Sequence, residues 1–243
     1  MFGRKKRADS TENVERNKVY AVIPGAGSSR RMGGGNKLLL PIAGEPVLRR
    51  TLEAFALCEA IDGIVLSCRA DQMDEYESLC SRWQVGKQII LTTGGATRAE
   101  SVYRGVLACP PDTAYVAIHD AARPFIRPEL IAQTVETAKR DSAAALAVEV
   151  KDSIKRVKNG RMVENVERDS IVAVQTPQCF DIDLIRAALH RVVTENISVT
   201  DDCGAAELLG QPTTIVAGDY NNIKITTQED IVLGEQIWKE QHG

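Results

Sequence analysis

Residues 19–37 read VYAVIPGAGSSRRMGGGNK, a short apolar run followed by a loop of small residues that carries cations. The run Val19-Tyr20-Ala21-Val22-Ile23 is typical of a buried β-strand. Glycines after such a strand let backbone N–H groups approach a phosphate chain without a side-chain clash. Arg31 and Lys37 add the positive charge that a nucleoside triphosphate needs when its pyrophosphate leaves. The segment predicts a phosphate-binding loop whose first residues contact the nucleotide: Pro24, Gly25, Ala26 and Gly27.

Two better-known phosphate motifs fit this loop less well. A dinucleotide fingerprint needs a third glycine where this chain has Arg30, and a Walker loop needs Gly-Lys-Ser/Thr where it has Asn36-Lys37-Leu38. A surface loop with incidental charge is the structural alternative. The motif alone therefore indicates phosphate binding without fixing the nucleotide.

Strand and helix patterns alternate along the rest of the chain. We predict further strands at residues 63–67, 88–91, 115–118, 143–150 and 213–217. We predict helices at 47–56, 71–83, 97–108, 129–140, 181–193, 201–209 and 228–240. Alternation with nearly continuous apolar strands predicts an α/β protein with a Rossmann-like, mostly parallel sheet and helices on both faces.

The alternation breaks at about residues 151–174, where two polar strands flank Asn159-Gly160. This dipeptide favours a type I′ turn, so we expect a β-hairpin arm that projects from the sheet. Residues 1–17 are polar, begin with a basic cluster and are expected to form a disordered tail. Residues 18–243 are expected to form one domain.

Bulk composition excludes several classes of protein. The net charge of −3 argues against a nucleic-acid binder that works by overall charge. Apolar runs are too short for a membrane span, and the three histidines form no zinc motif. Six scattered cysteines without a Cys-x-x-Cys pair indicate reduced thiols and a cytoplasmic protein.

Two segments that follow predicted strands carry candidate site residues. Gly94-Gly95 leaves backbone groups open to the edge of a base, and Ser101 adds a hydroxyl. An ordinary glycine turn with Thr97 capping a helix explains this segment equally well. Asp120 ends the strand before Ala121-Ala122-Arg123 and suits a divalent cation or sugar-like hydroxyls, or it pairs locally with Arg123.

Two later segments are also candidates. Arg168 and Thr176 are predicted to hold a phosphate jointly, by a guanidinium fork and a hydroxyl, although exposed hairpin charge is the simpler interpretation. Lys224 lies in the apolar, strand-like stretch 221–226, where a charge needs a partner or an anionic ligand. An edge-strand lysine that reaches water is the alternative.

In series, these segments resemble the 2-C-methyl-D-erythritol 4-phosphate cytidylyltransferase family of isoprenoid precursor synthesis. The resemblance extends from about Lys18 to Trp238. It rests on the loop 25–37, Gly94-Gly95 with Arg98 and Ser101, His119-Asp120-Ala121-Ala122-Arg123-Pro124, Thr176-Pro177-Gln178, Thr200-Asp201 and Asn222-Ile223-Lys224. Ala96 departs from it, because some members carry an aspartate there.

The resemblance implies a Rossmann-like nucleotidyltransferase that uses CTP, a polyol phosphate and Mg²⁺ or another divalent cation. It implies that Arg31 and Lys37 stabilise charge on the CTP phosphates, and that Gly95 and Ser101, together with Gly94 and Ala121, contact the nucleotide. Asp120 and Lys224 would hold methylerythritol phosphate, with Asp120 the only candidate metal ligand beside the CTP phosphates. A homodimer is implied, in which Arg168, Thr176 and Thr200 reach the substrate from the partner subunit.

Other functions remain open at this point. Ribitol 5-phosphate cytidylyltransferases share most of these motifs, so the acceptor is less firmly indicated than CTP. A non-catalytic nucleotide-sensing module would not need Lys37 and Lys224. An NAD-dependent oxidoreductase is disfavoured by Arg30. No partner nucleic acid or membrane is expected.

Overall fold

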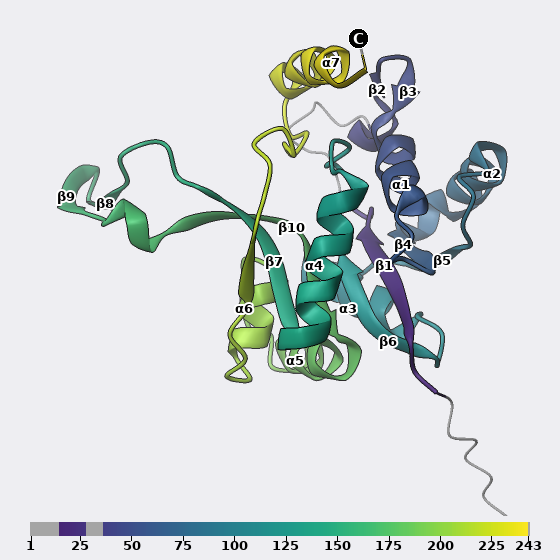
Figure 1. Ribbon diagram of the computed structural model, residues 1–243, viewed down its shortest axis with the longest axis horizontal. Coiled ribbons are helices and arrows are strands. Elements are labelled where there is room, and N and C mark those ends of the chain that lie inside the picture. Colours follow the sequence, from purple (N-terminus) through teal and green to yellow (C-terminus); the bar gives the residue numbers. More distant parts are fainter. Residues whose placement is uncertain (1–14, 28–35, 243) are drawn as a thin grey trace, which may run out of the picture.

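The computed structural model describes residues 15–27 and 36–242. Its centre is one seven-stranded sheet in the order β11-β7-β10-β6-β1-β4-β5 (Figure 1). The strands are β1 Lys18–Pro24, β4 Gly63–Cys68, β5 Ile89–Thr93, β6 Thr113–Ile118, β7 Ala143–Glu149, β10 Val172–Asp181 and β11 Thr214–Ala217. Pairing is parallel except where β10 runs antiparallel to β6 and β7. The predicted α/β class with a mostly parallel sheet is confirmed.

Helices cover both faces of this sheet, as predicted. They are α1 Val47–Leu57, α2 Met73–Trp83, α3 Arg98–Leu107, α4 Pro128–Asp141, α5 Ile182–Thr194, α6 Asp202–Glu207 and α7 Gln228–His242. Smaller elements are η2 Lys37–Leu39, β2 Pro41–Ile42, β3 Glu45–Pro46, η3 Ala70–Gln72 and η4 Arg168–Ser170. No helix within the described residues is both long and apolar enough to cross a bilayer.

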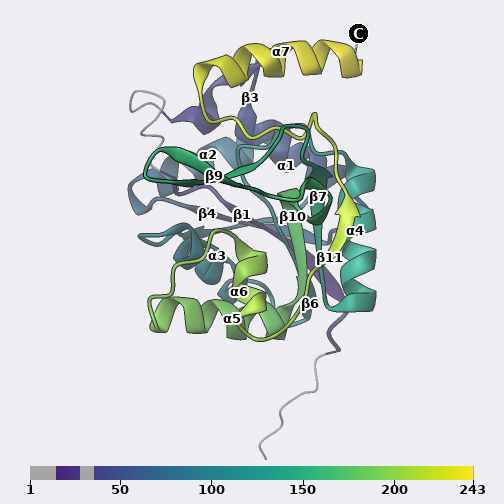
Figure 2. The same ribbon diagram turned by 90° about the vertical axis from the view of Figure 1, so that its left-hand side faces the viewer.

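The side chains of β1 show how the two faces are buried. Val19, Ala21 and Ile23 join the core formed with α1, α2, α4 and α7, whereas Val22 joins the core formed with α3, α5 and α6. This is the two-residue alternation of a strand covered on both sides. Both ribbon views place α7 beyond the carboxyl ends of the parallel strands (Figures 1 and 2).

Strand β10 is missing from the sequence prediction, which expected no strand between the hairpin and residue 181. The polar residues Gln175, Thr176 and Gln178 and the imino acid Pro177 interrupt its apolar pattern. Residues 175–180 are nevertheless buried, because the polar side chains have internal partners such as the carbonyl of Asp219 for Gln175 Nε2 at 2.8 Å. The pairing register with β7 shifts between Val174 and Gln178, around the proline.

The predicted hairpin arm is confirmed as β8 Lys155–Lys158 and β9 Arg161–Asn165. Asn159 and Gly160 both have positive φ, at 49° and 73°, as a type I′ turn requires. Every residue of the two strands is exposed, and the arm projects away from the sheet (Figure 1).

Two other predictions concern the ends of the chain. Residues 1–14 of the tail that was predicted to be disordered lie outside the described residues. In the described part of this tail, Arg16 pairs with Asp183 at 2.6 Å. The strand-like conformation expected for residues 221–226 is wrong: the sheet ends at β11 and this segment is irregular. Isolated backbone hydrogen bonds hold this segment in place, among them the one from Ile225 N to Ala122 O at 2.8 Å.

Candidate active site

The two glycine loops predicted to bind the nucleotide lie against each other at the carboxyl edge of the sheet. Gly25 N donates to Ser67 O and Gly94 N to Cys68 O, both at 2.7 Å, at the end of β4, which lies between β1 and β5. A Cβ on Gly94 would lie 2.4 Å from the Cβ of Ala26. Glycine is required at position 94 because the loops approach so closely. Pro24–Gly27 and Gly94–Gly95 therefore form one continuous backbone surface.

Ser101 stabilises this surface from beneath. It is 3% exposed, accepts a hydrogen bond from Gly95 N at 3.0 Å and donates one to Thr97 O at 2.9 Å. Thr97 caps α3 by accepting from Glu100 N, as the structural alternative expected. In this structure the Ser101 hydroxyl orients Gly95 within the chain, and the glycine turn with Thr97 as the helix cap is present. A contact of Gly94 and Gly95 with a nucleotide stays a prediction.

Asp120 lies at the centre of a cluster of cations at the end of β6. Its Oδ2 is 2.8 Å from Lys224 Nζ and 3.5 Å from Arg123 Nε, and its Oδ1 is 3.3 Å from Arg98 Nε. Burial alone would raise the pKa of this carboxyl, but Arg98, Lys224 and Arg123 outweigh burial and hold the pKa well below its ordinary value. Asp120 is therefore ionised throughout the physiological range, and the cluster carries an excess of positive charge.

This environment does not fit Asp120 as the protein's ligand for a divalent metal. Both of its oxygens already face cations, and a magnesium site needs several oxygen ligands. No group of three or more histidine, cysteine, aspartate or glutamate side chains suited to a metal occurs within the described residues. The expected metal role of Asp120 is therefore replaced by ion pairing with Lys224, Arg98 and Arg123.

Arg98 links Asp120 to helix α6. Its guanidinium donates two parallel bonds to Asp202, at 3.0 and 2.8 Å, and Asp202 is 1% exposed. Gln178 fixes the start of the same helix: its Oε1 accepts from Asp202 N at 3.0 Å, and its Nε2 donates to Asp201 Oδ2 at the same distance. Sequence reasoning missed Asp202, although it directly follows the Thr200-Asp201 motif.

A neutral histidine fixes the backbone of Asp120. Burial lowers the pKa of His119 to about 4. Its Nε2 lies 3.1 Å from the carbonyl of Arg123, which can only accept, so Nδ1 accepts from the Thr176 hydroxyl at 3.0 Å. The oxygen of Thr176 in turn accepts from Asp120 N at 3.1 Å.

This chain of bonds corrects the prediction for Thr176. Its side chain is 4% exposed and occupied by His119 and Asp120, so it does not join Arg168 at a shared phosphate within this chain. Thr176 supports the Asp120 loop instead.

Two other predicted site residues differ in exposure. Thr200 is exposed and directly precedes Asp201, the cap of α6. Ala121 is buried, and its carbonyl accepts a hydrogen bond from Thr51 Oγ1 at 3.0 Å.

The last motif, Asn222-Ile223-Lys224, also contacts the residues around Asp120. Arg123 Nη1 donates to Asn222 O at 2.7 Å, and Asn222 Nδ2 donates to Thr176 O at 2.9 Å. Lys37 Nζ donates to Ile225 O at 2.7 Å. Lys37 and Lys224 are thus brought to one region, whereas Arg31 lies outside the described residues.

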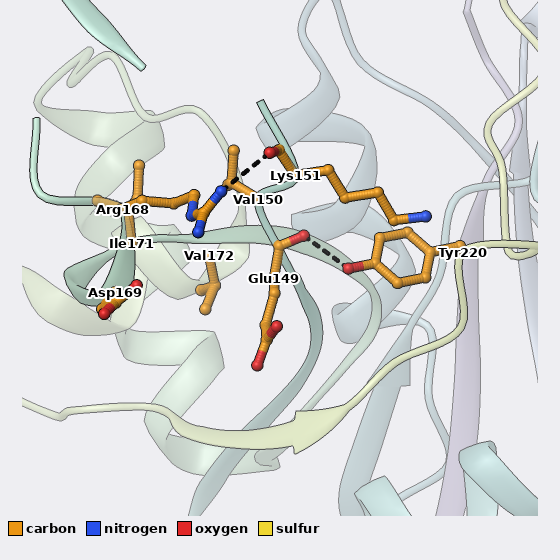
Figure 3. A pocket seen from close by; sticks show the side chains of 8 residues that line it. All are labelled: Glu149, Val150, Lys151, Arg168, Asp169, Ile171, Val172 and Tyr220. Atoms are coloured by element: carbon orange, nitrogen blue, oxygen red, sulfur yellow. Dashed lines mark hydrogen bonds between the residues drawn. The ribbon is translucent and has the colours of Figure 1, made fainter. Parts of the chain in front are cut away.

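Arg168 lies at the root of the arm, in a separate cavity of about 500 Å³. The cavity is lined by Glu149, Val150, Lys151, Arg168, Asp169, Ile171, Val172 and Tyr220 (Figure 3). Arg168 Nη1 donates to Lys151 O at 3.2 Å.

Comparison with known proteins gives a family match over nearly the whole chain. The sequence profile of the 2-C-methyl-D-erythritol 4-phosphate cytidylyltransferase family matches residues 19–240. A protein of that name from Halalkalibacterium halodurans is 40% identical over 221 residues, covering 90% of this chain and 96% of the relative. Another from Bacillus velezensis is 39% identical and covers 91% of this chain and 96% of the relative.

Solved structures give the same result. The crystal structure of 4-diphosphocytidyl-2C-methyl-D-erythritol synthase from Anaerococcus prevotii is 31% identical and superimposes with a TM-score of 0.82, covering 91% of this chain and 96% of the other. The Thermus thermophilus 2-C-methyl-D-erythritol 4-phosphate cytidylyltransferase is 28% identical, with a TM-score of 0.74, covering 92% of this chain and 100% of the other. Both superpositions cover more than nine-tenths of this chain.

Proposed function

Because the chain belongs to the 2-C-methyl-D-erythritol 4-phosphate cytidylyltransferase family, we propose that it transfers CMP from CTP to the phosphate of 2-C-methyl-D-erythritol 4-phosphate. The products are 4-diphosphocytidyl-2-C-methyl-D-erythritol and pyrophosphate. The observation that carries the proposal is the convergence of Asp120, Lys224 and Lys37 at the edge of the sheet where the two glycine loops also lie. The whole of residues 18–243 would act as one catalytic domain.

The barrier to this reaction is mainly electrostatic. An oxygen of the acceptor phosphate attacks the α-phosphorus of CTP, an O–P bond forms, and the bond to pyrophosphate breaks in line. Both substrates are anions, so cations must offset their repulsion and the charge that grows on the leaving group. Lys37 and Arg31 serve the triphosphate, while Lys224 and Arg168 align the acceptor. No proton needs to be moved in this step.

The rest of the site would bind and orient. The nucleotide would lie against the loops 24–27 and 94–95, whose shape is fixed by internal bonds from Gly25 N, Gly94 N and Gly95 N. Asp120 would accept from substrate hydroxyls while keeping Lys224 oriented. His119 and Thr176 fix the Asp120 loop, which restricts the motion of the charged side chain.

Mg²⁺ is proposed as the cofactor, held mainly by the CTP phosphates. The ion pairs of Asp120 with Lys224 and Arg98 support this division, because both oxygens of its carboxylate already face cations. The metal would neutralise charge on the triphosphate.

We also propose that the protein is a homodimer and that it is located in the cytoplasm. The arm exposes apolar side chains, namely Val157, Met162, Val163, Val172 and Val174. A lone two-stranded ribbon is marginally stable in water, so packing against a second copy would stabilise it. The arm's Arg168 would then serve the partner's site, together with Thr200. All six cysteines are unpaired thiols, in keeping with a reducing compartment.

The test is pyrophosphate release from CTP in the presence of Mg²⁺ and single polyol phosphates. We expect turnover with 2-C-methyl-D-erythritol 4-phosphate and formation of the cytidine diphosphate-linked product by mass spectrometry. Equal or faster turnover with ribitol 5-phosphate would transfer the assignment to that acceptor. CTP binding without turnover on any acceptor would instead support a nucleotide-sensing module.

A further inference from the structure

Two side chains of α3 besides Ser101 bond to the loop 94–96, which precedes that helix. Glu100 Oε2 accepts a hydrogen bond from Ala96 N at 2.8 Å. Arg104 Nη1 donates to Gly94 O at 2.9 Å. Neither Glu100 nor Arg104 is among the predicted site residues. Both ends of the loop are therefore bonded to the helix that follows it.

Glu100 and Arg104 are also bonded to each other. Arg104 Nη2 donates to Glu100 Oε1, across the four-residue spacing that places two side chains on one face of a helix. The bond from Ala96 N and the guanidinium of Arg104 hold the pKa of Glu100 below its ordinary value, so this carboxylate is charged at neutral pH. A closed series of bonds thus runs from Gly94 O through the two side chains to Ala96 N.

The middle residue of the loop shows how closely this series covers the backbone. A Cβ on Gly95 would lie 2.3 Å from both Cγ and Cδ of Glu100. A larger residue at position 95 would therefore displace the Glu100 side chain. Gly95 N is itself bonded to Ser101 Oγ at 3.0 Å. Each residue of the loop is bonded to a different side chain of α3.

Stabilisation of the helix end explains only part of this arrangement. Thr97 Oγ1 accepts from Glu100 N at 3.1 Å, and Glu100 bonds back to the preceding Ala96, much as in a capping box. A capping box does not use Arg104, which lies in the second turn of α3 and bonds to a residue ten positions earlier. The contact of Arg104 with Gly94 therefore fixes the loop rather than the end of the helix.

We propose that Arg104, together with Glu100, is a positioning residue that holds the loop 94–96 in the shape required for CTP binding. The inference rests on the proposed function and adds a residue that acts through the loop. A loop that is fixed before the ligand arrives has less conformational freedom to lose on binding. Loss of Arg104 should therefore reduce the affinity for CTP.

Steady-state kinetics provide the first test. Arg104→Met keeps most of the stem but removes the donors, and should raise KM for CTP about 3- to 10-fold, the range expected for one or two hydrogen bonds. The acceptor KM and kcat at saturating CTP should stay unchanged. Arg191→Met is the matched control, because Arg191 also pairs with a glutamate four residues later and donates to a backbone carbonyl, that of Leu208. It should alter neither KM.

Two further variants separate positioning from helix capping. Glu100→Ala should also raise KM for CTP, and its effect should be smaller in the Arg104→Met background, because the two side chains act as one unit. Thr97→Ala removes the cap of α3 and should lower the melting temperature without changing KM for CTP. Additive effects of Glu100→Ala and Arg104→Met, or a KM in Thr97→Ala as high as in Arg104→Met, would overturn the inference.

Binding measured without an acceptor does not depend on turnover. Calorimetric titration with CTP and Mg²⁺ should give a Kd for Arg104→Met that is raised by the same factor as KM. Weaker binding in this variant, combined with a wild type that converts no acceptor, would reject the proposed function and support the role of Arg104. An unchanged Kd in an active enzyme would reject that role alone. A wild type that binds no CTP would reject both.

Discussion

The ammonium of Lys37 donates a hydrogen bond to the carbonyl of Ile225 at 2.7 Å, joining two segments that are 188 residues apart. Ile225 N is itself bound to Ala122 O in the loop that follows Asp120. The first and last motifs of the chain therefore support the same charged centre, and Lys37 is positioned before any substrate arrives. Such preorganisation is what electrostatic catalysis requires.

Lys37→Ala should lower turnover strongly while the protein remains folded. One preorganised cation beside developing charge contributes about 3 kcal/mol, which corresponds to a rate loss of about 100-fold. Pyrophosphate release at saturating CTP measures the effect. Lys139→Ala, on the exposed surface of α4, removes a similar charge far from the site and should have no effect. If Lys37→Ala kept the wild-type rate, the loop would bind the nucleotide without contributing to catalysis.

Asp120→Asn should destabilise the protein in a pH-dependent manner. The pKa of Asp120 is depressed below its ordinary value of 3.8, so its ion pairs contribute above that pH and are lost as pH falls through the folded-state pKa. Removing one partner of a buried pair costs about 3 kcal/mol. Urea unfolding at several pH values should show the largest difference from wild type near neutrality and a smaller one below about pH 4. A difference independent of pH would contradict the ion-pair assignment.

Thr176→Val should disturb the Asp120 loop without changing the size of the side chain. Asp120 N and His119 Nδ1 would both lose their hydrogen-bond partner in a buried place, at a cost of about 2 kcal/mol. Thermal unfolding and turnover should both decline, and Thr176→Ser should recover them. Thr137→Val, which removes an exposed hydroxyl from α4, is the control. Full stability of Thr176→Val would exclude the proposed hydrogen-bond chain.

Much of this fold could be predicted from local pattern. The strand at β1, the helices and the Asn159-Gly160 turn follow from periodicity and turn chemistry, which act over a few residues. Strand β10 could not be predicted in this way. Its buried glutamines and Thr176 are compatible with a sheet only because partners from residues 119, 201 and 219 satisfy them.

The site could be predicted in part, for the same reason. Motifs identified Lys37, Asp120 and Lys224, because charged residues after strands of a parallel sheet meet at one edge. Asp202 has no motif, and its place in the site comes from its long-range contact with Arg98. The role of a residue that acts through a distant neighbour can be inferred only from the folded structure.

The final prediction concerns whether Arg168 serves a second subunit. If the protein is a homodimer, mixing Arg168→Ala and Lys37→Ala proteins should give heterodimers in which one site keeps Lys37 from one chain and Arg168 from the other. If the arm completes the partner's site, that site should work, and the mixture should recover activity that neither variant has alone. Turnover is measured after exchange of subunits has been established by native mass spectrometry. Complete exchange without recovery would mean that Arg168 acts within its own chain, since each site in the mixture would then lack one of the two cations.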